Sequence, residues 1–593
     1  MKTFFASLLG TLVGIVVSFF VLFFILIALF SATFTALKMA QEKPSPIEKN
    51  SVLLIKLDKQ ITERTQKNIF YSFHFNDDLP IGLNDILTNI KVAKTDSSIK
   101  GILLEINLPA IGSASIEEIR NALLDFKTSG KFIFSYNDNY SQMSYYLSSV
   151  ADKLFLNPQG SIQLKGLSAQ IMFYKNALDK LGIQMQIFRH GRFKSAVEPL
   201  DLDKMSNDNR QQTKTYLNSI WSVIVNSIGV SRNITPQSIN NIADSLLAQS
   251  ADDALKYKLV DQLCYKDEAL ALLKKQIGIS KDDDISFVKL NDYTQAARAK
   301  KLLQKNNFSD GKIAIVYAVG EIQSGTGDDQ TIGASTLVNA LRTADEDENV
   351  KAIVLRVNSP GGSAQASDII WHEIMKIKKD KPVIVSMGDV AASGGYYISC
   401  AADTIFAEPT TISGSIGVFG MIPNVQKLMN DKLGITVDTV NTNKHSDIGS
   451  IYRPMTSIEA ASVQRGVENV YATFLQRVSD GRHVTVAQVD SIGQGRVWSG
   501  IDAQKKGLVD LLGNLDDAIA MAAKCAKIKN YGLVVYPKQE DAWKTLFSKY
   551  GNSVKIDILQ SELGEQYSIY NHLKTMIHTG GIQAEMPYQI TIY

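Results

Sequence analysis

The sequence predicts an α/β protein in which one domain occurs twice, behind an N-terminal membrane-spanning helix. Three observations lead to this prediction. Short β-branched runs alternate with segments of helical periodicity, the second half of the chain repeats the first, and the N-terminus holds a long uncharged apolar stretch. Strands that alternate with helices at this spacing are typical of parallel βαβ units.

The strand and helix patterns are clearest in the second half of the chain. Residues 312–317, 352–357 and 382–385 are short apolar runs rich in β-branched residues, and they indicate buried strands. Between the last two runs, residues 366–379 carry apolar side chains at helical spacing. These side chains are Ile369, Ile370, Ile374 and Ile377.

The N-terminal stretch predicts a membrane anchor. Residues 3–37 include no charged side chain, and residues 8–30 are mostly Leu, Ile, Val and Phe. A bilayer core needs about 20 apolar residues, whereas the apolar core of a signal peptide has only about 7–15. Lysines lie on both sides of the stretch, so the positive-inside rule does not decide the topology.

Composition excludes several classes of protein. Of 593 residues, 45% are hydrophobic and 21% charged, which is typical of a globular chain. The formal net charge of +2 gives no basic excess for binding nucleic acid. The cysteines Cys264, Cys400 and Cys525 lie far apart and show no zinc spacing or disulfide framework.

The body of the chain is duplicated. Residues 100–152 align without a gap to residues 351–403, a shift of 251, and 15 of these 53 positions are identical. Later in each half, Leu181 and Leu433 begin the same tripeptide at a shift of 252. A period this long indicates a duplicated domain rather than a solenoid repeat. We therefore expect an anchor and linker at 1–45, repeat domains at 46–298 and 299–540, and a tail at 541–593.

The two copies differ where chemistry is expected. The second copy reads "NSPGGS" after a strand and "AASGGYY" after the next, and the first copy has neither glycine pair. Gln142 of the first copy aligns with Ser393 of the second, so any serine chemistry belongs to the second copy. Backbone N–H groups at Gly361, Gly362 and Gly394 could face an oxyanion, because glycine admits a close backbone approach. Tight βα turns would equally explain these glycines.

A base for Ser393 is not evident from local sequence. None of the seven histidines lies in a triad motif, and the serine lacks the G-x-S-x-G pattern. A lysine can activate serine when desolvation lowers its pKa from about 10.4. The residues alone do not show which lysine would act as the base for Ser393.

Four motifs carry a family resemblance. "VNSPGGSAQASD", "MGDVAASGGYYISCAAD" and "TISGSIGVFG" in the second copy, with "GRFKSAVEPL" in the first, resemble bacterial signal peptide peptidase A in its long, two-domain form. The resemblance spans about residues 50–540 and also covers the anchor. It implies a Clp-protease/crotonase-like fold of ββα units. It also implies Ser393 as nucleophile, Lys194 as general base and Ser415 as the hydroxyl that orients the lysine.

The lysine assignment has rivals. Short relatives carry serine and lysine in one domain, and this chain has Lys444 in "NTNKHSDIG". A shift of 252 places Lys444 opposite Arg192 rather than Lys194, so Lys194 is favoured, with His445 as a third candidate.

The resemblance implies a membrane-anchored serine endopeptidase that degrades remnant signal peptides and other short apolar peptides through an acyl-enzyme. It implies a homotetramer in the bacterial inner membrane, with the body on the extracytoplasmic side and no metal, cofactor or nucleic acid. Two alternatives remain at this point: an acyl-CoA hydratase or isomerase of the same fold, and a non-catalytic membrane scaffold. The tail carries no motif, and we expect it to pack against the body or form an interface.

Overall fold

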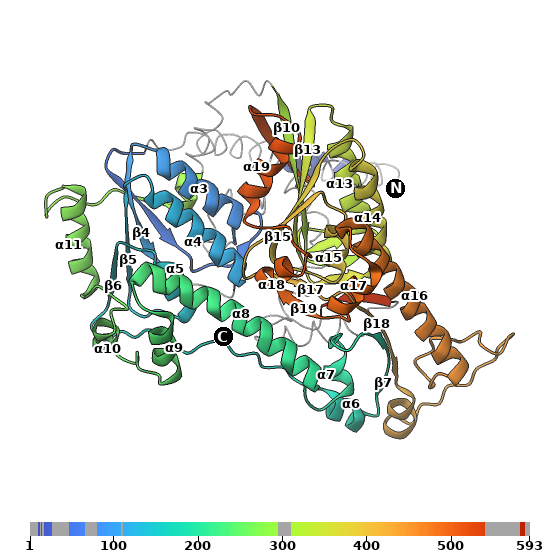
Figure 1. The fold of residues 1–593 in the computed structure, drawn as a ribbon. Coiled ribbons are helices and arrows are strands. Elements are labelled where there is room, and N and C mark those ends of the chain that lie inside the picture. The colour runs from blue at the N-terminus through green and yellow to red at the C-terminus, as the bar shows by residue number, and fades with distance from the viewer. Residues whose placement is uncertain are drawn as a thin grey trace.

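A computed structural model gives the fold and describes residues 10–11, 14, 17–25, 47–65, 80–107, 111–294, 310–539 and 582–586. Two α/β halves lie side by side, the first coloured blue to green and the second yellow to red (Figure 1). Most of the predicted membrane anchor falls outside the described residues. Within these ranges, no helix has the length and apolarity that a membrane span requires.

The first half forms a six-stranded parallel sheet with the strand order β8-β6-β5-β4-β1-β9. Most residues of its four inner strands, β6, β5, β4 and β1, are apolar and buried, as expected for a sheet covered on both faces. The strands are β1 (Ser51–Lys56), β4 (Ile99–Glu105), β5 (Phe132–Asn137), β6 (Lys153–Leu156), β8 (Gln262–Leu263) and β9 (Phe287–Lys289).

The second half repeats this topology. Its parallel strands follow the order β20-β16-β15-β13-β10-β21, which matches the first sheet strand for strand. They are β10 (Gly311–Val319), β13 (Val350–Ser359), β15 (Val383–Ala392), β16 (Thr404–Ala407), β20 (Leu511–Leu512) and β21 (Tyr531–Tyr536). The end of β15 also pairs with β17 (Ile412–Gly414), which pairs with β19 (Val497–Ser499). The structure therefore confirms the predicted duplication of an α/β fold.

The helices repeat in the same order, except that α6 and α7 have no α-helical counterpart in the described residues of the second half. Those of the first half are α3 (Leu83–Thr95), α4 (Ser113–Lys127), α5 (Gln142–Ser148), α6 (Lys175–Leu181), α7 (Glu198–Asp201), α8 (Asn207–Arg232), α9 (Pro236–Asp244), α10 (Ala251–Lys256) and α11 (Lys266–Ile277). Those of the second half are α13 (Ala334–Glu346), α14 (Ala364–Ile377), α15 (Gly394–Ser399), α16 (Ser457–Arg482), α17 (Val486–Ile492), α18 (Gly500–Lys505) and α19 (Leu515–Cys525).

Helix α14 shows how local sequence sets an element. The Ser363 side chain caps it by accepting a hydrogen bond from the Ala366 N–H, which satisfies one of the free donors of the first turn. Ile370, Ile374 and Ile377 are buried in the core of the second half, as their spacing predicts. Ile369 was expected on the same face, but it is 48% exposed because it lies beyond the edge of the apolar stripe.

A third, smaller sheet joins the halves, with the order β12-β11-β14-β22-β18-β7. Its strands are β7 (Gln184–His190) of the first half, β11 (Glu321–Gln323), β12 (Thr331–Gly333), β14 (Gly361–Ser363) and β18 (Val418–Asn424) of the second, and β22 (Ile582–Glu585) near the C-terminus. Figure 1 shows β7 extending from α6 beneath the second half, beside β18. A segment of the first half is thereby built into a sheet of the second.

A buried ion-pair network also crosses between the halves. Arg356, on β13, is fully buried and donates hydrogen bonds to both carboxylate oxygens of Glu63 and to the carboxylate of Glu118. Glu63 and Glu118 belong to the first half, and both are buried. Because a buried charge without a partner is very unfavourable, this network holds the two halves in one relative position.

Candidate active site

Ser393 lies at a sharp corner between β15 and α15. Its backbone has φ 55° and ψ −113°, a conformation that L-residues other than glycine rarely adopt. The Ser393 N–H donates a hydrogen bond of 2.8 Å to the carbonyl oxygen of Gly414, and the side chain is fully buried. Strained strand-to-helix corners of this kind present a nucleophile at the end of a sheet, although this chain lacks the usual G-x-S-x-G sequence.

Lys194 reaches the same place from the other half. It lies in the loop that follows β7, and β7 pairs with β18 from His190–Val418 to Gln184–Asn424. The Phe193 N–H donates to the Gln494 carbonyl oxygen at 2.8 Å, which fastens the loop to the second half. At Gly495, a Cβ would lie 2.5 Å from the Lys194 backbone nitrogen, so only glycine allows this approach.

The lysine amine meets two serine side chains. Lys194 Nζ lies 2.8 Å from Ser393 Oγ, 3.1 Å from Ser415 Oγ and 3.3 Å from the Ser415 carbonyl oxygen. Ser415 follows β17 with φ 50° and is fully buried, as Lys194 is. The structure thus brings together the three side chains that the sequence singled out, and Ser415 holds the amine beside Ser393.

Burial changes the ionisation of this lysine. Desolvation lowers the pKa of Lys194 from 10.5 to about 7, and the nearby carboxylate of Glu585 opposes this change. Burial also raises the pKa of Glu585 to about 7, with Glu321 acting in the same direction and Lys194 against it. A large fraction of the Lys194 amine is therefore neutral near pH 7 and able to accept a proton.

The three glycines occupy two different positions. A Cβ on Gly361 would lie 2.7 Å from the Gly394 backbone nitrogen, so these two backbones are in contact beside Ser393. Gly362 has φ 144° and faces strand β11, where a Cβ would lie 2.1 Å from the Ile322 carbonyl oxygen. The contact with Gly394 places Gly361 next to the serine corner, whereas Gly362 is held in the pairing of β11 with β14.

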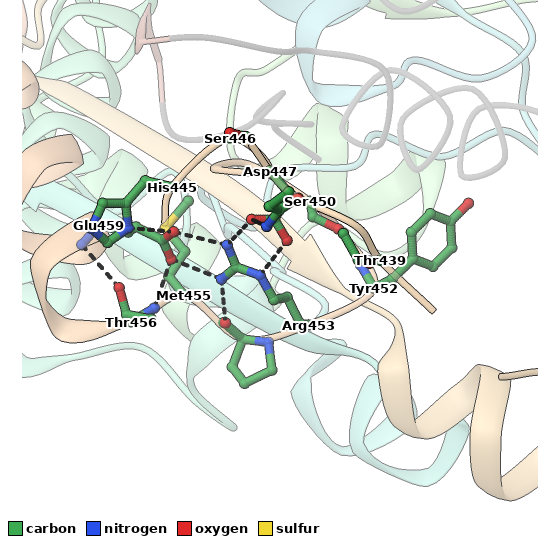
Figure 2. Close-up of polar contacts among 12 residues, drawn as sticks. Thr439, His445, Ser446, Asp447, Ser450, Tyr452, Arg453, Met455, Thr456 and Glu459 are labelled. Atoms are coloured by element: carbon green, nitrogen blue, oxygen red, sulfur yellow. Dashed lines mark hydrogen bonds and ion pairs between the residues drawn. The ribbon is translucent and has the colours of Figure 1, made fainter. Parts of the chain in front are cut away.

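The rival bases lie elsewhere. Lys444 is exposed in the loop between β18 and α16. His445 Nδ1 is 3.0 Å from Glu459 Oε1, and Arg453 joins that carboxylate to Asp447 (Figure 2). This polar cluster supports the loop and the start of α16, where Glu459 completes the cap with Thr456.

The first copy has a structural residue at the serine position. The Gln142 side-chain oxygen accepts hydrogen bonds from the Lys165 and Gly166 N–H groups, each at 2.9 Å, and its nitrogen donates to the Gly166 carbonyl oxygen. Helix α5 begins here after an ordinary cap at Ser141, with φ −65° instead of the strained corner. The first copy therefore keeps the scaffold without the reactive geometry.

Sequence reasoning missed the contribution of the C-terminal tail. Strand β22 pairs with both β14 and β18, next to the glycine loop, and Glu585 acts electrostatically on Lys194. The tail lacks a motif, so no local pattern indicated this position.

Comparison with known proteins places the chain in a family. The model of peptidase family S49 matches residues 125–280 and 375–529, one segment in each half, and the Clp protease model matches residues 314–412. Protease 4 of Salmonella typhi is 36% identical over 523 residues, covering 87% of this chain and 81% of that protein. The chloroplastic serine protease SPPA of Arabidopsis thaliana is 32% identical, covering 91% and 78%.

A shorter relative matches only part of the chain. A protein of Enterococcus faecium named as a signal peptide peptidase SppA is 36% identical over 197 residues, which are 33% of this chain and 57% of that protein. Together with the duplicated α/β fold, the matches define a serine peptidase with two tandem domains. The chain belongs to peptidase family S49. An acyl-CoA enzyme or a non-catalytic scaffold does not fit this assignment.

Proposed function

We propose that Ser393 and Lys194 are the catalytic pair of this peptidase, with Ser393 as nucleophile and Lys194 as general base and acid. The observation that carries the proposal is the 2.8 Å contact between Lys194 Nζ and Ser393 Oγ in a fully buried site. A neutral lysine within hydrogen-bond reach of a serine hydroxyl is the arrangement that Ser–Lys hydrolases use.

The reaction follows from this geometry. Ser393 Oγ attacks the carbonyl carbon of a peptide bond while its proton passes to the Lys194 amine. The lysine then gives the proton to the leaving nitrogen, and an acyl-enzyme ester remains on Ser393. Water, deprotonated by Lys194, attacks the ester, and the proton returns to Ser393 Oγ. Ser415 keeps the amine directed at Ser393 throughout.

The developing oxyanion needs donors on the other side of Ser393. The donors we assign to it come from the backbone N–H groups of Gly361, Gly362 and Gly394, and the backbones of Gly361 and Gly394 are in contact at the start of α15. The Gly361 N–H donates to Ser359 Oγ at 3.2 Å and would exchange this partner for the oxyanion. Gly362 lies in the pairing of β14 with β11 and β22.

For the substrates we propose remnant signal peptides and other short apolar peptides. The name of the Enterococcus faecium relative supports this choice, as does the long apolar stretch near the N-terminus, which would hold the body beside a membrane. The anchor would lie in the bacterial inner membrane, with the body on its extracytoplasmic side.

For the assembly we propose a homotetramer. Strand β7 of the first half pairs with β18 of the second, but the segment that corresponds to β7 in the second half, residues 436–442, forms no strand and is exposed. Residues 167–173, which correspond to β18 in the first half, are also without a strand. A neighbouring molecule could pair these two segments in the same way. Such a head-to-tail contact would repeat from one subunit to the next, and a ring of four subunits would close it.

The loop that contains residues 436–442 exposes apolar side chains, as a protein–protein interface does. Several of its large apolar side chains are exposed, which is unusual for a monomer. They are Leu433, Ile435, Val437, Val440, Ile448 and Tyr452.

The decisive experiment uses the full chain in detergent with a serine-directed fluorophosphonate probe and a short apolar fluorogenic peptide. We expect the wild type and Lys444→Ala to react with the probe and to cut the peptide. Ser393→Ala should do neither, and Lys194→Ala should cut the peptide no faster than Ser393→Ala. An active Lys194→Ala with an inactive Lys444→Ala would reject Lys194 as the base.

A further inference from the structure

The loop that carries Lys194 is bound by one side chain of helix α8. This helix lies beside β19 (Figure 1), and Gln212, near its start, is 2% exposed. The Gln212 side-chain nitrogen donates hydrogen bonds to the Phe193 carbonyl oxygen and to Ser195 Oγ, each at 3.0 Å. Phe193 and Ser195 are the neighbours of Lys194 in the sequence, so Gln212 holds the loop on both sides of the lysine.

The oxygen of the same amide reaches the second half. The Val497 N–H donates a hydrogen bond of 3.2 Å to Gln212 Oε1. Val497 lies on β19 opposite Gly414 of β17, and the Gly414 carbonyl oxygen accepts the hydrogen bond from the Ser393 N–H. One amide group therefore joins the lysine loop to the pair of strands that holds the serine corner.

Only an amide of this length serves both ends of the contact. Its nitrogen is a donor and its oxygen an acceptor, whereas the carboxylate of a glutamate has no donor. The orientation of the amide is fixed by Asn209, because the Asn209 nitrogen donates to the Glu198 carboxylate at 2.8 Å and its oxygen lies 3.2 Å from Gln212 Nε2. The nitrogen of Gln212 therefore faces the loop and its oxygen faces β19.

Helix α8 has a second attachment to β19 that does not involve Gln212. Further along the helix, Ser219 Oγ lies 2.7 Å from Ser499 Oγ at the end of β19. A change at Gln212 therefore leaves the helix docked on the second half and acts on the lysine loop alone.

We propose that Gln212 is a positioning residue of this peptidase, which holds the Lys194 amine at Ser393 and keeps water away from it. The proposal rests on the catalytic pair proposed above and adds the group that fixes its geometry. Gln212 touches neither the substrate nor the reacting atoms, and it acts through its bonds to Phe193 and Ser195. A displacement of about 1 Å in a reacting group can cost about 10²-fold in rate.

The ionisation of Lys194 reports whether the loop is in place. Desolvation is the main reason why the pKa of Lys194 is lowered from 10.5 to about 7. If the loop separates from β19 and water reaches the amine, this pKa rises toward its ordinary value. Gln212→Met replaces one neutral side chain by another of similar length, so it removes the hydrogen bonds without adding a charge.

The charges around the lysine loop stay in place in this variant. They are Glu585 of β22, which acts on the Lys194 amine, Glu321 of β11, which acts on Glu585, Arg192 and Asp208, which pair at 2.9 Å, and Arg496, which stacks over Phe193.

The test measures kcat and KM against pH for the full chain, with an apolar fluorogenic peptide that has no titrating group. We expect Gln212→Met to lower kcat at pH 7 by about 10²-fold, because the amine no longer faces Ser393 in the productive geometry. KM should stay close to that of the wild type, since Gln212 makes no substrate contact. The midpoint of kcat/KM should move from about 7 toward 10.5. Gln211→Met, at the exposed neighbouring position of the same helix, is the matched control and should behave as the wild type.

A purely structural role gives a different result. Titration with a fluorophosphonate probe would then count fewer reactive sites in Gln212→Met, and the midpoint of those that remain would equal that of the wild type. Such a result rejects the proposal. If circular dichroism shows that Gln212→Met does not fold, Ser195→Ala decides, because it removes one acceptor beside Lys194 and should move the midpoint in the same direction by less. An unchanged midpoint in Ser195→Ala then rejects the proposal.

Failure of the proposed function is recognised separately. If Lys194→Ala cuts the peptide as fast as the wild type, the lysine is not the base and both proposals are wrong. If Lys194→Ala is inactive while Gln212→Met keeps the wild-type kcat and midpoint, only the positioning role of Gln212 is rejected.

Discussion

Lys194 Nζ lies 2.8 Å from Ser393 Oγ, although 199 residues separate them and each belongs to a different copy of the duplicated domain. The pairing of β7 of the first half with β18 of the second brings the loop that contains Lys194 to Ser393. One copy supplies the strained serine corner and the other supplies the lysine that we propose as the base. The duplication is therefore part of the proposed active site, since neither half by itself holds both groups.

Replacing the lysine tests this division. We expect Lys194→Ala to lower kcat/KM on an apolar peptide by about 10³-fold or more, because general-base catalysis contributes about 10²–10⁴-fold and the nucleophile also loses its activation. Lys444→Ala should stay within about twofold of the wild type, since this lysine is exposed in a loop. Equal losses in the two variants would show that the reaction does not depend on the buried amine.

The pH dependence follows from the ionisation of Lys194. Burial lowers its pKa to about 7, and only the neutral amine accepts the serine proton. The rate should therefore rise as the pH increases through about 7 and level off above it. The measurement is kcat/KM against pH for the full chain, with a peptide that has no titrating group. A midpoint near 10 would show a solvated lysine instead.

Glu585 should influence that midpoint. Its negative charge raises the pKa of Lys194, so its removal lowers that pKa and makes neutral amine available at lower pH. We expect the full chain with Glu585→Gln to give a kcat/KM profile shifted to lower pH than the wild type. The kcat/KM profile is the relevant one because it reports ionisation in the free enzyme. Coincident profiles would place Glu585 away from the amine.

The glycine loop can be tested by adding a single methyl group. Gly361→Ala places a Cβ 2.1 Å from the Ala584 carbonyl oxygen and 2.7 Å from the Gly394 backbone nitrogen, next to Ser393, so kcat should fall by at least about 10²-fold. Gly278→Ala is the control, because its φ of 79° imposes similar backbone strain with nothing within 4 Å of the new methyl. Circular dichroism shows whether each variant is folded. A fully active Gly361→Ala would remove this loop from the oxyanion site.

The buried ion-pair network between the halves should contribute strongly to the free energy of unfolding. Arg356→Met leaves the buried carboxylates of Glu63 and Glu118 without their partner, and we expect a loss of about 3–5 kcal/mol in the free energy of unfolding. Lys91→Met breaks an exposed pair with Asp516 and should cost less than about 1 kcal/mol. Chemical denaturation of both variants gives the comparison. Similar losses would show that the Arg356 network does not hold the halves together.

Much of this fold was predictable from local patterns. Buried strands such as β13 are continuous apolar runs, and the identical strand order of the two sheets follows from a repeat visible at a shift of 251 residues. Ser393 was predictable as well, because the glycines beside it occur in one copy only. Ile369 shows the limit of periodicity, since the edge of an apolar stripe depends on what packs beside it.

The sequence by itself determined the α/β class, the duplication and the serine, because each depends on the order of neighbouring residues along the chain. The choice of lysine needed a family resemblance, and the tertiary structure then showed Lys194 beside Ser393. Only the tertiary structure decided the position of β22 between β14 and β18 and the charge of Glu585 beside Lys194. These relationships join residues that are far apart in sequence. They arise when strands pair across the two halves and water is excluded from the space between them, and no local pattern of residues records either event.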